Sequence, residues 1–146
     1  MKKIIGFLPI LFLIANAILV TICYQDLPDI IPSHFNIKGE VDGYGDKSTI
    51  IIPLMIHIGI TLLLSWIGNH PEKHNYSVTI TEENKAAQYA LSSRLTRNLN
   101  VIIGMIFTTI SYSIAHPTFP KFFVLMELGL IFGVIVVHFY QSSNKK

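Results

Sequence analysis

The sequence predicts an all-α, polytopic membrane protein with four transmembrane helices, an ordered outer loop and a cytoplasmic helix before the third span. Two observations predict this class. Hydrophobic residues make up 51% of the 146-residue chain and charged residues only 14%, whereas soluble domains average about 25% charged residues. Four apolar runs approach the roughly 20 residues that a ~30 Å hydrocarbon core requires, and a backbone in lipid must bond internally as a helix.

The four predicted spans take up most of the chain. They lie at about 4–23, 50–67, 98–115 and 122–140, joined by an outer loop at 24–49 and a cytoplasmic loop at 68–97. A single domain over residues 1–146 is expected, because these helices and loops use all of it. The first run passes an Ala15-Asn16-Ala17 cleavage pattern and exceeds the about 7–15 apolar residues of a cleaved signal peptide, so we expect an uncleaved helix.

The distribution of basic residues predicts the orientation of the spans. Of the 11 lysines and arginines, eight lie at the two termini or in the 68–97 loop, and three lie in the other two loops. Cytoplasmic segments carry the excess of positive charge, so both termini are predicted to be cytoplasmic. The 24–49 loop then faces outward, and it is acidic, with five carboxylates against two lysines.

The second half of the cytoplasmic loop has the features of a helix. Thr79-Ile80-Thr81-Glu82 has the spacing of a capping box, in which a hydroxyl and a carboxylate three residues later bond the first backbone amides. Residues 83–98 that follow contain no proline or glycine, and we expect a polar helix of about 15 residues that leads into the third span. The prolines of the 116–120 segment end that span and permit the fourth to begin.

The outer loop combines restrained backbone with polar side chains. Its prolines, Pro28 and Pro32, fix φ and favour extended neighbours. Its glycines at 39, 43 and 45 permit turns. Loops held in one geometry commonly carry function. The side chains that this geometry could bring together are His34, Phe35, Asp42, Tyr44 and Lys47.

The same loop carries a family resemblance. The pattern formed by Pro32, His34, Phe35, Gly39, Asp42, Gly43 and Lys47, with Pro53 beyond, is similar to a bacterial membrane domain of unassigned function. That domain is found in SdpI-like proteins, the immunity and signalling proteins of the Sdp toxin system. The resemblance implies a bacterial cell membrane as the location, and a peptide toxin or a partner membrane protein as the ligand.

Polar residues within the spans predict a second part of the site. At ~1.5 Å of rise per residue, Asn16, His57 and Glu127 all fall roughly 10 Å below the outer surface. Such residues are costly in lipid and tend to face the bundle interior. We therefore expect a polar pocket beneath the outer loop, with His57 as the nearest partner of Glu127.

Other kinds of site find less support in the sequence. His34 and Asp42 could form a metal pair, but a zinc site needs three or four ligands, and we assign no metal, cofactor or catalytic residue. Cys23 is the only cysteine, so the chain cannot form an internal disulfide. No nucleotide-binding glycine motif is present, and the basic residues are explained by the orientation of the spans, so no nucleic acid is expected as a partner. Gly129 and Gly133 have the small-xxx-small spacing that lets helices approach closely, within one chain or in a homo-oligomer.

Three functions remain open from the sequence. The first is binding or sensing of a ligand, a peptide toxin or a partner protein by the outer loop and the pocket beneath it. The second is a small oligomeric transporter or proton-linked carrier that uses His57 and Glu127. The third is a metal-dependent membrane enzyme that uses His34, Asp42 and Glu127.

Overall fold

The computed structural model describes residues 2–36, 38–120 and 122–144, with side chains from residue 7 onward. Three of the basic residues used to predict orientation, Lys121, Lys145 and Lys146, lie outside this range. The long helices are α1 (Lys2–Tyr24), α2 (Ile51–Gly68), α3 (Lys85–Ala115) and α4 (Phe122–Ser143). The strands are β1 (Ile30–Phe35) and β2 (Val41–Asp46), and two short 3-10 turns are η1 (Lys47–Ile50) and η2 (Pro71–Lys73).

All four long helices are long and apolar enough to cross a membrane. Large apolar side chains cover their outer faces, among them Phe132, which is 70% exposed, and Leu62, which is 64% exposed. A water-soluble monomer rarely exposes a contiguous apolar surface of this extent. The predicted fold class, a multi-pass helical membrane protein, is therefore confirmed, with a small two-stranded sheet in addition.

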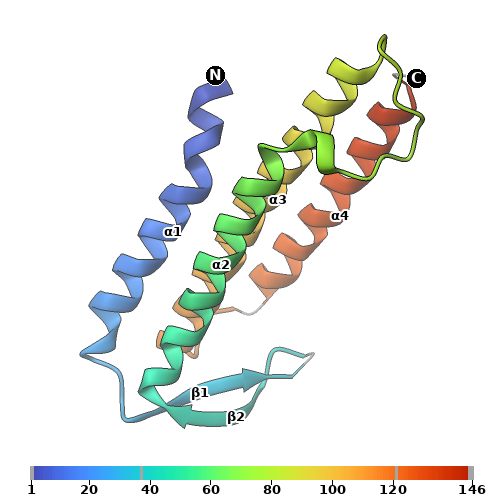
Figure 1. The fold of residues 1–146 in the computed structure, drawn as a ribbon. Coiled ribbons are helices and arrows are strands. Elements are labelled where there is room, and N and C mark those ends of the chain that lie inside the picture. Colours follow the sequence, from blue (N-terminus) through green and yellow to red (C-terminus); the bar gives the residue numbers. More distant parts are fainter. Residues whose placement is uncertain (1, 37, 121, 145–146) are drawn as a thin grey trace.

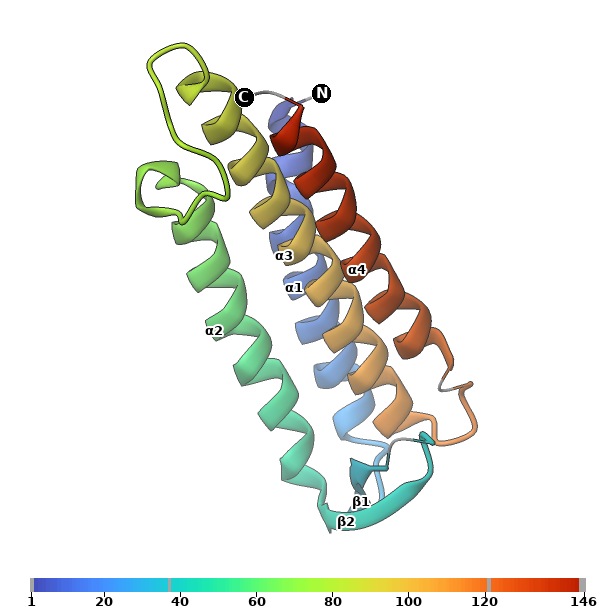
Figure 2. The ribbon, with the colours of Figure 1, turned by 90° about the vertical axis from the view of Figure 1, so that its right-hand side faces the viewer.

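The helices run from one end of the molecule to the other around α3 (Figure 1). The helix α3 packs against α1, α2 and α4, whereas α4 packs mainly against α3. Figure 2 shows α4 on one side of α3 and α2 on the other. The sheet lies at one end, which we call the hairpin end, and both termini lie at the other, which we call the terminal end.

The outer loop is a β-hairpin, which the sequence analysis did not anticipate. The strands β1 and β2 pair antiparallel from Ile30 with Asp46 to Phe35 with Val41, with an irregular register around His34. Among the described residues of this loop, only Gly39 has a positive φ, at 78°. Gly43 instead allows the two strands to approach closely, because a Cβ at this position would lie 3.0 Å from the Cβ of His34. The pattern looked like a loop because glycine and aspartate are depleted in strands.

A cluster of buried apolar side chains holds the hairpin against the helix ends. Ile31 of β1 and Ile50 of η1 are almost completely buried, with 1% and 0% of their surface exposed. They pack with residues from the ends of α1 and α3 and from the segment between α1 and β1: Val20, Leu27 and Ile114. The hairpin is thus ordered by the same burial that stabilises soluble cores.

The third span and the predicted polar helix form one continuous helix of 31 residues. At ~1.5 Å per residue it is about 46 Å long and extends beyond the ~30 Å hydrocarbon core. The reciprocal capping bonds form two residues later in the sequence than predicted. The Thr81 hydroxyl accepts a bond from the Asn84 amide at 3.3 Å, and the Asn84 side-chain oxygen accepts one from the Thr81 amide at 2.9 Å. Asn84 takes this role because an amide oxygen can accept the bond as a carboxylate does.

Candidate functional site

A groove lies beneath the hairpin, between β1 and the hairpin ends of α3 and α4. Its volume is about 460 Å³, which falls within the range of small-ligand sites. Its walls are mainly apolar and include Phe35, Ile110, Ile114, Phe122 and Leu125. Polar groups at its margin include His34, Asn36 and Lys38.

The tip of the hairpin is fixed by one side chain, so that the margin of the groove has a defined shape. The Asn36 side-chain oxygen accepts bonds from the backbone amides of Lys38 at 2.9 Å and Glu40 at 3.0 Å. The Asn36 amide group donates to the Glu40 carboxylate at 2.8 Å. Asparagine is typical of such turns because its short side chain imitates a backbone carbonyl.

His34 and Asp42 face one another across the two strands. The His34 Nδ1 and the Asp42 Oδ1 lie 2.5 Å apart, and the side chain of His34 remains 72% exposed. Within the part of the chain that the structure describes, no group of three or more His, Cys, Asp or Glu side chains could hold a metal ion. The pair therefore acts as a cross-strand contact that orients His34 at the margin of the groove.

Tyr44 and Lys47 do not line the groove, contrary to the predicted convergence of the loop side chains. Tyr44 lies on β2 and is 68% exposed. Lys47 pairs with Asp29 at 3.1 Å, and its ammonium lies 5.9 Å from the centre of the Tyr24 ring. These contacts attach the base of the hairpin to the end of α1. Neighbouring Asp46 accepts hydrogen bonds from Ser48, which lower the pKa of the Asp46 carboxyl.

Asn16 and His57 meet inside the membrane-spanning part of the molecule. The Asn16 amide group donates to the His57 Nδ1 at 3.1 Å, and both side chains have 0% of their surface exposed. The His57 ring also stacks on Phe107, with 5.5 Å between ring centres. The pair therefore lies where α1, α2 and α3 come together.

Glu127 has a different partner from the predicted one. Its Oε1 accepts a bond from the Thr109 hydroxyl at 2.8 Å, between α3 and α4. Phe107 and Thr109 are two residues apart on α3 and so point about 200° apart around the helix. Because Phe107 faces His57 and Thr109 faces Glu127, α3 lies between them. The expected pairing of His57 with Glu127 was wrong, since α4 joins only the far side of α3.

Two further polar links between helices were not predicted from the sequence. The Asn100 amide group donates to the Thr61 backbone oxygen at 3.2 Å and the Ser65 hydroxyl at 3.1 Å. Gln88 and Ser142 exchange two bonds, of 3.0 and 2.8 Å, near the terminal end. Asn100 was detectable, because it lies four residues before Gly104 on a small and polar stripe of α3. The pair of Gln88 and Ser142 gave no such signal, since polar residues are common near helix ends.

Comparison with known proteins points to the same region of the chain. Residues 11–57 match the model of a domain of unknown function (DUF1648). This segment resembles DUF1648. The DUF1648-like segment contains most of α1, the whole hairpin and the start of α2 as far as His57, and thus both residues of the Asn16–His57 pair and of the His34–Asp42 pair.

One curated protein is similar over a longer stretch. An uncharacterised protein of Archaeoglobus fulgidus is 27% identical over 128 residues, which cover 78% of this chain and 67% of that protein. No solved structure matches the chain. The similarity extends beyond the DUF1648-like segment, so the relative shares more with this chain than the hairpin and its flanking helices.

Proposed function

We propose that this protein binds an amphipathic ligand, of the class of a hydrophobic peptide with an acidic end, in the groove beneath the hairpin. The observation that carries the proposal is the groove itself, with its apolar walls and the lysine at its margin. A peptide could bury its apolar side chains against Ile110 and Leu125 while its carboxylate meets Lys38. A peptide ligand also fits the resemblance of the hairpin sequence to SdpI-like proteins.

The position of the groove supports an amphipathic ligand over a water-soluble one. Ile110 and Ile114 lie in the last turns of α3, near the boundary that the helix length implies for the hydrocarbon core. Amphipathic peptides concentrate at this boundary, where apolar groups enter the lipid and charged groups stay in water. The groove is thus at the depth where such a ligand accumulates.

The proposal places the hairpin outside the cell and the termini in the cytoplasm, as the basic residues indicate. Labelling with a membrane-impermeant thiol reagent tests this orientation. In a Cys23→Ser background, Lys38→Cys at the hairpin tip should react in intact cells and Lys85→Cys at the start of α3 should react only after lysis. The opposite labelling pattern would place the groove in the cytoplasm and would refute an extracellular ligand.

Binding is tested with a photoreactive hydrophobic peptide that carries a free C-terminal carboxylate, added to the full chain in proteoliposomes. Leu125→Trp should fill the groove, because Leu125 lines it and is 62% exposed. We expect crosslinking to fall about tenfold, which corresponds to some 60 Å² of lost apolar contact. Crosslinks in the wild type should map to the groove residues of β1 and α3.

The matched control is Leu128→Trp, which adds the same side chain at an exposed position of α4 outside the groove. It should leave crosslinking unchanged. Lys38→Glu should reduce the crosslinking of the peptide with a free C-terminal carboxylate. It should leave unchanged the crosslinking of the same peptide with a C-terminal amide. Equal crosslinking in both tryptophan variants would show that the peptide does not use the groove.

The geometry favours binding over a proton-linked carrier. A carrier of the kind that the sequence left open needs His57 and Glu127 on one pathway. The two side chains instead occupy separate interfaces on either side of α3. The groove beneath the hairpin requires no such pathway, so we place binding first.

A further inference from the structure

A second groove lies near the terminal end, between α3 and α4, far from the proposed peptide site. Its volume is about 270 Å³. One stripe of α3 and one stripe of α4 line it, each with the three- and four-residue spacing of a single helix face. The residues are Leu91, Arg94, Leu95, Asn98, Gly133, Val134, Val137, His138 and Gln141.

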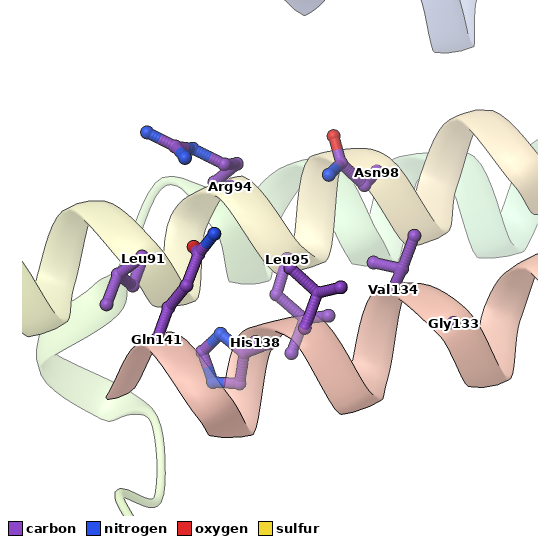
Figure 3. A pocket seen from close by; sticks show the side chains of 9 residues that line it. Leu91, Arg94, Leu95, Asn98, Gly133, Val134, His138 and Gln141 are labelled. Atoms are coloured by element: carbon purple, nitrogen blue, oxygen red, sulfur yellow. The ribbon is translucent and has the colours of Figure 1, made fainter. Parts of the chain in front are cut away.

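The basic and titratable side chains of the groove, Arg94 and His138, lie toward one of its ends. Figure 3 shows Arg94, Gln141 and His138 toward the C-terminal end of α4, together with Leu91. Val134 and Gly133 lie further along α4, and Asn98 of α3 lies level with Val134. At Gly133 the groove has free space, because a Cβ there would meet no atom within 4 Å. The end with Arg94 suits a polar head, and the free space at Gly133 suits a hydrocarbon tail.

The depth of Arg94 matches that of a lipid headgroup. Arg94 lies 21 residues before Ala115, the last residue of α3, which is about 32 Å along the helix. The hydrocarbon core is ~30 Å thick, so the guanidinium reaches the headgroup region of the leaflet at the terminal end. Gly133 and Val134 then lie within the hydrocarbon region.

The charge around Arg94 favours an anionic head. Arg94 is exposed, and among the described residues no carboxylate lies within 4 Å of its guanidinium. The residues that line the groove include no aspartate or glutamate. A guanidinium binds a phosphate oxygen pair with two parallel bonds. Gln141 supplies a neutral donor at the same end of the groove, and Asn98 lies about one helical turn further along α3.

We propose that this groove binds one anionic phospholipid, with its phosphate on Arg94 and an acyl chain along Gly133, Val134 and Val137. The lipid would fill the space between α3 and α4 and contact both helices at once. This inference concerns the opposite end of the molecule from the peptide groove and stands whether or not that groove binds a peptide.

Native mass spectrometry of the full chain in detergent tests the proposal, with phosphatidylglycerol and phosphatidylcholine as probes. The wild type should bind a first phosphatidylglycerol about fivefold more tightly than phosphatidylcholine, as one arginine at a headgroup predicts. Arg94→Gln should remove this preference, and Gly133→Leu should reduce the binding of both lipids.

Two controls isolate the groove. Arg97→Gln removes a charge of the same helix that does not line it, and Gly129→Leu adds the same side chain one turn away, also into open space. Both control variants should bind phosphatidylglycerol and phosphatidylcholine as the wild type does. If Arg94→Gln and Arg97→Gln behave alike, or if Gly133→Leu binds like Gly129→Leu, the site does not exist. A dimer that Gly133→Leu dissociates, with lipid binding unchanged, would assign the groove to a second copy of the chain. If Gly133→Leu fails to fold, the comparison of the two arginine variants still decides.

Discussion

Replacing Ile31 by alanine should destabilise the protein by about 2–5 kcal/mol, the usual cost of truncating a buried isoleucine. Ile31 is 1% exposed and packs with Val20, Leu27, Ile50 and Ile114. The cavity would form where the hairpin meets the helix ends. We therefore expect a lower unfolding midpoint together with faster hydrogen exchange across 30–46.

The adjacent residue provides the control. Ile30 has the same side chain on the same strand but is 61% exposed. Ile30→Ala should change the free energy of unfolding by no more than a few tenths of a kcal/mol. If the two variants lose the same stability, Ile31 does not attach the hairpin to the helices, and the groove beneath it has no fixed wall.

The second large effect is expected from Gly104→Leu on α3. A Cβ at this position would lie 2.9 Å from the Cβ of Phe12 and 3.3 Å from the Nε2 of His57. The Phe12 Cβ cannot rotate away, so α1 must move as a whole. Overpacking of this kind costs about 1–3 kcal/mol, and thermal unfolding in detergent should show the loss.

Gly59→Leu on α2 is the matched variant, because a Cβ there meets nothing within 4 Å. Both substitutions gain the same helix propensity, so the difference between them reports packing alone. A stable Gly104→Leu variant would mean that α1 does not pack against α3 at this level.

The sequence predicted the helices well and their arrangement poorly. Span length and composition follow from the thickness of the bilayer, so the four spans were predictable. The place of α4 was not, because packing between helices in lipid depends on shape and on a few polar bonds rather than on total hydrophobicity. The hairpin was missed because its strands contain Pro32 and Gly43, residue types that are depleted in strands. At Gly43 the reason is the close approach of His34 on the paired strand.

The candidate site divides in the same way. The depth of each polar residue in the membrane could be calculated from the fixed rise of a helix. Asn16 and His57, which were expected at the same depth, do contact each other. Which way a side chain points around the bundle depends on the neighbouring helix. Glu127 was therefore placed at a suitable depth but with the wrong partner, and Thr109 was not considered. The His34–Asp42 contact follows from strand pairing that the sequence analysis did not include.

Two of the polar links between α3 and α4 restrict how the fourth helix can move. Thr109 bonds Glu127 toward the hairpin end, and Gln88 bonds Ser142 toward the terminal end. A slip of α4 by one helical turn, about 5.4 Å, would break both links at once. Lipid tails offer no replacement partner for Thr109 or Glu127, whereas Gln88, 27 residues before Ala115 on α3, lies beyond the hydrocarbon core. Sliding of α4 along its axis is therefore opposed by both links, and rotation of α4 about its axis would break the same bonds. The two links therefore fix the position of α4 along the axis of α3.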